Sequence, residues 1–91
     1  MILLDFHATW CEPCKWSEPI VDQVVRDFEG EIVLQKIDID EDPERARSFN
    51  IRSVPTFVLI DGPQEIWRMN GFDTAIRMTA SIREAINKNS L

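Results

Sequence analysis

The residues most able to do chemistry in this chain are its only two cysteines, Cys11 and Cys14, which are separated by two residues. They follow an apolar run typical of a buried strand, residues 2–6, and they precede a pattern typical of a helix. Free N–H groups and partial positive charge at a helix start stabilise a thiolate at the first cysteine. The second thiol would lie one helical turn further on, close enough to attack a mixed disulfide. This placement predicts a dithiol that cycles with a disulfide.

Two other roles for the cysteine pair are less well supported. A structural zinc site needs four ligands, but the chain offers one C-x-x-C pair and a single histidine, His7. A purely structural disulfide would close so short a loop that it would restrict the unfolded chain very little. The predicted chemistry requires no metal and no bound organic cofactor.

Composition limits the possible partners and locations. The chain has 91 residues, of which 44% are hydrophobic, and we expect a single domain over residues 1–91. The net charge of −6 is spread along the chain, which argues against nucleic acid or an anionic membrane as a partner. No apolar run approaches the ~20 residues that span a bilayer, and the amino end lacks the pattern of a secretory signal. We therefore expect a cytoplasmic monomer.

The rest of the pattern predicts the elements that must position the cysteines. Apolar residues recur at helical spacing from Cys14 to Phe28, and residues 32–37 are typical of a second buried strand. Because a helix joins these two strands, they should be parallel. The elements expected after them are a short helix from residue 42, a strand over 57–60, a turn at 61–64, an antiparallel strand over 65–69, and a helix capped by Asp73 or Thr74. The predicted fold is α/β: a four-stranded mixed sheet, two parallel strands plus an antiparallel hairpin, with helices on both faces.

The chain resembles thioredoxin over essentially its whole length. The residues that carry the resemblance are Asp5-Phe6, Trp10-Cys11-x-Pro13-Cys14-Lys15, Pro19, Lys36, Asp38-Ile39-Asp40, Pro43, Val54-Pro55-Thr56 and Gly71. A C-x-x-C motif alone is moderately specific, whereas its combination with Val-Pro-Thr about forty residues later is strongly specific. The resemblance implies a minimal thioredoxin-like fold and a protein-disulfide reductase. Disulfide-containing proteins would be its substrates, and a reductase or another dithiol donor would recycle it.

Three features depart from the usual thioredoxin pattern. The family's usual first strand and helix have no counterpart here, so we expect one exposed sheet edge and one thinly covered sheet face. His7 stands where the family usually has an aromatic residue, and Glu12 replaces the usual glycine between the cysteines. The resulting Cys-Glu-Pro-Cys sequence is similar to that of some extracytoplasmic reductases that serve cytochrome c maturation. The Glu12 carboxylate opposes negative charge on Cys11, which should make the protein slightly more reducing.

Proton transfer is the role that the resemblance implies for Asp5. A carboxylate in an apolar strand is costly to bury unless it has a partner or a task. The resemblance implies that Asp5 exchanges a proton with Cys14, and Lys36 on the neighbouring strand is the expected partner of Asp5. A purely structural Asp5–Lys36 pair is the alternative. His7 should point to the same face as Asp5, where it either tunes this proton chemistry or fills the space of an aromatic side chain.

The resemblance also implies a surface that receives substrates. Cys11 would be its exposed nucleophile, with Cys14 as the more buried resolving thiol. A cis peptide bond before Pro55 would leave the Val54 backbone free to pair with an extended substrate, whereas a trans proline that starts a strand is the alternative. The residues expected to bind substrate are Trp10, Pro13, Ile39, Val54, Pro55, Gly71 and Phe72.

Two other functions remain open for a chain of this kind. One is an oxidase or thiol-maintenance protein of an extracytoplasmic, oxidising compartment. The other is a non-catalytic binding module that keeps the fold as a scaffold. The redox potential of the cysteine pair discriminates the first from a reductase, and disulfide reduction in the presence of a dithiol discriminates the second.

Overall fold

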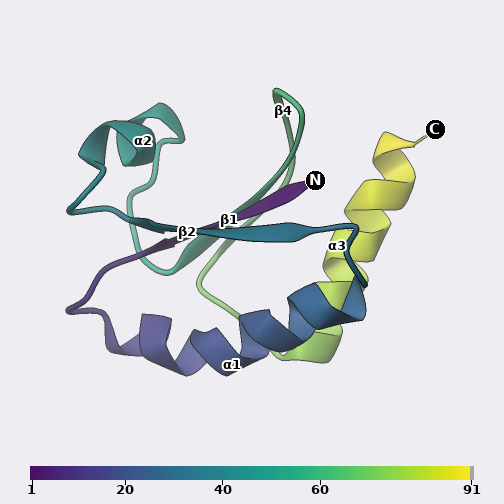
Figure 1. Cartoon of the computed structure of the whole chain (residues 1–91), viewed down its shortest axis with the longest axis horizontal. Coiled ribbons are helices and arrows are strands. Elements are labelled where there is room, and N and C mark those ends of the chain that lie inside the picture. The colour runs from purple at the N-terminus through teal and green to yellow at the C-terminus, as the bar shows by residue number, and fades with distance from the viewer. Residues whose placement is uncertain (91) are drawn as a thin grey trace.

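The computed structural model describes residues 1–90, whose helices and strands follow the predicted order. They are β1 (Ile2–His7), α1 (Glu12–Asp27), β2 (Val33–Asp38), α2 (Pro43–Ser48), β3 (Thr56–Asp61), β4 (Gln64–Asn70) and α3 (Ala75–Asn89). Figure 1 shows α1 and α3 together beneath the sheet, with α2 on the opposite side. The prediction of helices on both faces of one sheet is therefore confirmed.

The four strands form a mixed sheet in the order β2-β1-β3-β4. β1 pairs in parallel with β2 and antiparallel with β3, and β3 continues into the antiparallel hairpin with β4. The predicted parallel pair and hairpin are both present. β1 lies inside the sheet, so the loop after His7 brings the cysteines to the end of an internal strand.

The expectation that the second strand is buried is wrong. Only Ile37 is fully buried among the residues of β2, and Val33 is 62% exposed. The apolar run was typical of a central strand, but within residues 1–90 β2 has a neighbour on one side only. It therefore forms the exposed sheet edge that we expect from the departure from the usual family pattern. Its apolar residues Leu34 and Ile37 pack against two different clusters, whereas Val33 is exposed.

Side chains of β1 alternate between two apolar clusters. Leu3 belongs to the larger cluster, which fills the space between the sheet and the helices α1 and α3. Leu4 and Phe6 belong to a second cluster on the opposite face, together with residues next to α2. Successive strand residues point to opposite faces, so Asp5 and His7 share the α1 face with Leu3. The alternation thus places both polar side chains on the same side as the cysteine-bearing helix.

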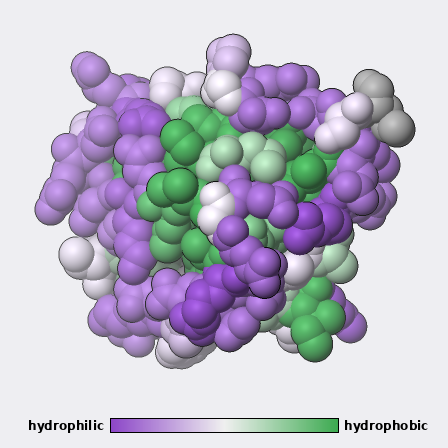
Figure 2. Space-filling view, turned by 45° about the vertical axis from the view of Figure 1, so that its right-hand side comes forward, coloured by the Kyte–Doolittle hydropathy of each residue, from purple (hydrophilic) through white to green (hydrophobic). Residues whose placement is uncertain are grey.

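One face of the sheet is thinly covered at the end away from α2. Ile2 lies opposite Val33 on one side and Ile60 on the other, and Ile2 is 37% exposed. Figure 2 shows a face of the molecule where apolar side chains gather at the centre, with hydrophilic side chains around them.

Within the described residues, no helix has the length and apolar character that crossing a membrane would require.

Local capping explains where the helices begin. The Thr74 hydroxyl accepts a hydrogen bond from the Arg77 N–H at 3.2 Å, so Thr74, and not Asp73, caps α3. Asp42 caps α2 in the same way, through the N–H of Arg45 at 3.1 Å. The cap of α1 is Cys11. The start of α1 is thus also the site of the predicted chemistry.

Candidate active site

Cys11 and Cys14 form a disulfide across the first turn of α1, with their Cα atoms 5.3 Å apart. Cys11 is the cap residue of the helix, and its sulfur accepts a hydrogen bond from the Cys14 N–H at 3.2 Å. Pro13 lies in the first turn, where its missing N–H removes no helical hydrogen bond. Once the bond is reduced, the same N–H groups and the helix dipole favour negative charge on Cys11.

The two sulfur-bearing residues are almost equally buried in this oxidised form. Cys11 is 4% exposed and Cys14 is 6% exposed, so the expectation that Cys11 is the exposed member of the pair is wrong here. The reason is local packing, because both residues belong to a small apolar cluster with Ala8, Ile39 and Val54. A difference in reactivity between the thiols must therefore come from their positions relative to the helix start and to nearby charged groups.

A cavity of about 270 Å³ lies beside Cys14, between α1, β1 and β2. Most of its lining residues are polar or titratable. The lining consists of Asp5, His7, Ala8, Thr9, Cys14, Lys15, Glu18 and Lys36. The structure therefore brings Cys14 together with Asp5, its expected partner Lys36, and His7.

Asp5 has a buried carboxyl group that is not fully hydrogen-bonded. It is 4% exposed, and its Oδ1 atom has no hydrogen-bond partner among the described residues. Burial raises the pKa of Asp5 from 3.8 to about 6, although the charges of His7 and Lys36 act in the opposite direction. The carboxylates of Glu18 and Asp22 add to the increase. A carboxyl group with such a pKa exchanges protons readily near neutral pH.

Lys36 lies next to Asp5 in the sheet but does not form an ion pair with it. The two residues are directly opposite each other in the β1–β2 register. The ion pairs within residues 1–90 do not include one between them. The structure thus speaks against the alternative of a purely structural Asp5–Lys36 pair, and the Lys36 charge acts on Asp5 at longer range.

The exposed surface around the disulfide contains most of the residues expected to bind substrate. Trp10 is 65% exposed, and its indole Nε1 donates a hydrogen bond to Asp40 Oδ2 at 2.9 Å. Pro13 is exposed as well. Ile39 and Val54 are half-buried against the cysteine cluster. These residues surround Cys11 with apolar surface.

The loop before β3 has the predicted cis peptide bond between Val54 and Pro55. Gly71 joins this loop, because its N–H donates to the Pro55 carbonyl at 2.7 Å. Gly71 has a φ of +85°, a conformation that a residue without a Cβ adopts readily. Phe72 is different: it packs against the main core between the sheet and the helices and is not part of the cluster around Cys11.

Glu12 and several residues outside the prediction complete the site. Glu12 is exposed and forms an ion pair with Lys15 at 3.3 Å, which partly offsets its charge next to Cys11. Glu18 lines the cavity because it lies one turn after Cys14 on α1. Ser17 is buried and donates to the Cys14 carbonyl at 2.8 Å. The i+3 and i+4 spacing from Cys14 was a signal that could have identified both Ser17 and Glu18.

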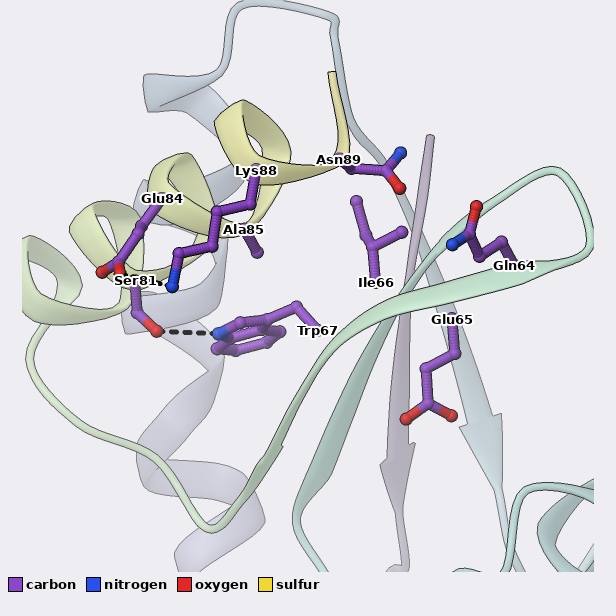
Figure 3. A pocket seen from close by; sticks show the side chains of 9 residues that line it. All are labelled: Gln64, Glu65, Ile66, Trp67, Ser81, Glu84, Ala85, Lys88 and Asn89. Carbon is purple, nitrogen blue, oxygen red and sulfur yellow. Dashed lines mark hydrogen bonds and ion pairs between the residues drawn. The ribbon is translucent and has the colours of Figure 1, made fainter. Parts of the chain in front are cut away.

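A second hollow, of about 510 Å³, lies between β4 and α3 and contains neither cysteine. Figure 3 shows Trp67 at its base, with the indole N–H donating to the Ser81 hydroxyl at 2.8 Å. Lys88 and Glu84 pair across successive turns of α3 at 2.9 Å. This hollow is larger, but Glu65 and Asn89 of its lining also have partners, in Arg68 and Asp61. Because most of its polar groups are paired and it contains neither cysteine, the cavity beside Cys14 is the better candidate for the active site.

A disulfide at a helix start, beside a buried carboxylate and on a mixed sheet, is an arrangement suited to thiol–disulfide exchange. The chain belongs to the thioredoxin family, whose model, described as Thioredoxin, matches residues 1–84.

Individual proteins support the same assignment. The chain is 39% identical over 70 residues to a thioredoxin of Chlorobaculum thiosulfatiphilum, and this match covers 77% of the chain and 65% of the relative. It is 40% identical over 65 residues to thioredoxin 1 of Nostoc sp., with 71% of the chain and 61% of the relative covered. The solved structure of Deadhead, a germline-specific thioredoxin of Drosophila melanogaster, has a TM-score of 0.82 at 35% identity, covering 91% of this chain and 78% of that one. The chain thus spans less than two thirds of these two curated relatives.

Proposed function

We propose that this protein reduces disulfide bonds in other proteins through a dithiol–disulfide cycle at Cys11 and Cys14. The observation that carries the proposal is the disulfide at the start of α1, next to a cavity that holds the buried carboxyl of Asp5. A structural disulfide needs neither the helix start nor a proton-exchanging group beside it. A site for thiol–disulfide exchange benefits from both.

The proposed cycle begins with the reduced protein. The Cys11 thiolate attacks one sulfur of a substrate disulfide, and the other substrate sulfur leaves as a thiolate that takes a proton from water. Cys14 then loses its proton, and its thiolate attacks the Cys11 sulfur. The bond between Cys11 and the substrate breaks, and the second substrate sulfur leaves with the electron pair. Two electrons have then passed from the protein to the substrate, and the Cys11–Cys14 disulfide has formed.

Asp5 is the proposed acceptor of the Cys14 proton. It lines the same cavity as Cys14, and burial raises its pKa to about 6, which suits proton exchange near neutral pH. Lys36, whose charge opposes this increase, would keep a fraction of Asp5 ionised and able to accept the proton. The cavity that these groups line, of about 270 Å³, has room for water to carry the proton between them.

The proposed substrate surface is the exposed region around Cys11. Trp10 and Pro13 offer exposed apolar area, and an extended substrate segment would pair with the backbone at Val54. Pro55 and Gly71 would shape this loop through their hydrogen bond. Phe72 is at most peripheral in this proposal, because its ring packs against the main core.

A reductase or another dithiol donor would return the disulfide to the dithiol. The names of the relatives support this part of the proposal. One of them is a bifunctional thioredoxin reductase/thioredoxin of Mycobacterium leprae, 39% identical over 70 residues, or 77% of this chain and 15% of that protein. We place the protein in a reducing compartment, for which the cytoplasm is the expected one, where it would act as a monomer in cellular redox homeostasis.

Reduction of insulin disulfides with dithiothreitol as the electron donor tests the proposal. We expect the protein to accelerate insulin precipitation well above the rate with dithiothreitol alone. Trp16→Phe is a suitable control, because Trp16 is exposed on α1 and is not part of the proposed site. No acceleration by a folded protein would contradict the proposal and would favour a binding module that keeps the fold as a scaffold.

A further inference from the structure

His7 has a position that a residue with a purely space-filling role does not need. It is half-buried at the end of β1, on the same strand face as Asp5, and it lines the cavity beside Cys14. Asp5 itself is only 4% exposed. His7 is therefore more accessible to solvent than the carboxyl group with which it shares a strand face and a cavity.

The contact of the imidazole ring with the backbone favours one of its two tautomers. His7 Nδ1 lies 3.4 Å from the backbone carbonyl oxygen of Asp5, which is long for a hydrogen bond. A carbonyl oxygen only accepts, so this contact is favourable when Nδ1 carries the hydrogen. In the neutral ring Nε2 then has a free lone pair and can take up a proton. Asp5 and His7 both line the cavity beside Cys14.

We propose that His7 is a positioning residue for proton transfer, which relays the proton of Cys14 from Asp5 to the solvent. The inference rests on the proposed function, because it concerns the step in which Cys14 resolves the mixed disulfide. The cavity of about 270 Å³ has room for several water molecules at roughly 30 Å³ each. Water can therefore bridge Asp5 and His7.

The relay moves one proton from Cys14 to bulk water and returns each group to its starting form. Cys14 gives its proton to the Asp5 carboxylate, and the Cys14 thiolate attacks Cys11 and displaces the substrate thiolate. Neutral Asp5 then passes the proton through water to Nε2 of His7, which becomes an imidazolium. The imidazolium releases a proton to bulk water and returns to the neutral form. No oxidant or reductant beyond the substrate disulfide is needed.

Charged groups of two elements packed against β1 lie near this relay. On α1 these are Lys15 and Glu18, and on β2 they are Lys36 and Asp38, which is directly opposite His7. Glu18 and the neighbouring Asp22 favour the protonated form of Asp5, whereas His7 and Lys36 favour the ionised form. The charge of an imidazolium would therefore help Asp5 to release its proton, which is the direction that the relay requires.

Reaction of the reduced protein with one equivalent of dithiobis-nitrobenzoate, followed by stopped flow between about pH 5 and 8, tests the proposal. The first release of nitrothiobenzoate reports attack by Cys11, and the second reports resolution by Cys14. We expect His7→Phe, which keeps an aromatic ring, to leave the first release unchanged. The second should slow about tenfold near neutral pH, less than the 100-fold of a direct general base, because water still reaches the cavity. His7→Ala should show the same defect, and added imidazole should restore its rate.

Several outcomes would overturn the proposal. One is a second release in His7→Phe with the rate and pH profile of the unmodified protein. Another is a second release that is slowed by the same factor at every pH in both variants, together with no effect of imidazole on His7→Ala. A purely structural role of His7 would produce that pattern. His7→Phe keeps the test valid if the alanine variant fails to fold. Failure of the proposed function itself is distinguishable, since the unmodified protein would then not accelerate insulin precipitation, whatever the rates of the two releases.

Discussion

Replacing Cys11 with serine should abolish disulfide reduction, whereas Cys14→Ser should accumulate mixed disulfides between substrates and Cys11. The reason is the position of Cys11 as the cap of α1, where the helix start stabilises its thiolate. Cys14 lies one turn further on and is needed only to release the substrate. We also expect iodoacetamide at mildly acidic pH to label Cys11 of the reduced protein far faster than Cys14, as peptide mass mapping would measure.

The near-equal burial of the two residues makes this labelling experiment informative. In the oxidised form the two residues are 4% and 6% exposed, so burial in that form does not favour Cys11, whereas its position at the helix start does. Equal labelling rates, or mixed disulfides that form through Cys14, would contradict the assignment of Cys11 as the nucleophile. The double variant with both cysteines replaced is the control for labelling of other groups.

Replacing Asp5 with asparagine should stabilise the oxidised protein near pH 7 while it slows the resolution of mixed disulfides. The pKa of Asp5 is raised from 3.8 to about 6 in the folded protein, so ionised Asp5 destabilises the fold. Two pKa units correspond to at most about 3 kcal/mol. The asparagine amide would leave buried donors without partners, which offsets part of this gain, and we expect about 1–2 kcal/mol in urea unfolding.

The pH dependence has a definite sign. Above about pH 6 Asp5 is ionised in both the folded and unfolded states, and the full destabilisation is present. As the pH falls from about 6 towards 4, the folded protein takes up a proton before the unfolded chain does, so the unmodified protein gains stability relative to Asp5→Asn. The advantage of the variant should therefore vanish below about pH 4. A destabilised variant with an unchanged resolution rate would instead indicate that Asp5 has a structural role.

Most of the fold could be predicted because the chain marks its elements clearly. The apolar run of β1, the turn at residues 61–64 and the caps at Asp42 and Thr74 each indicate an element by local chemistry. The edge position of β2 could not be predicted in this way. An edge strand, which pairs with one neighbouring strand, and an internal strand, which pairs with two, can have similar short apolar runs. Only the order of the strands in the sheet distinguishes them.

The candidate site shows the same division between local and tertiary information. Motif residues such as Cys11, Cys14, Asp5 and Pro55 were identified in advance, because their types and spacing are unusual. The cavity beside Cys14 depends on how α1 packs against β1 and β2, so no local pattern singles out its wall residue Thr9, whereas the i+4 spacing from Cys14 is a signal for Glu18. The burial of Cys11 and the core position of Phe72 likewise follow from packing between distant segments.

A redox titration of the Cys11–Cys14 pair against dithiothreitol buffers tests the central claim most directly. The fraction of alkylated protein would be read by mass at each potential. Thioredoxin itself, the standard example of this class, has a potential of about −270 mV, and we expect a value close to it. A potential near about −120 mV, as in strongly oxidising periplasmic proteins, would contradict a reductase and indicate an oxidase. A disulfide that does not exchange with the buffer at all would contradict any redox cycle at this site.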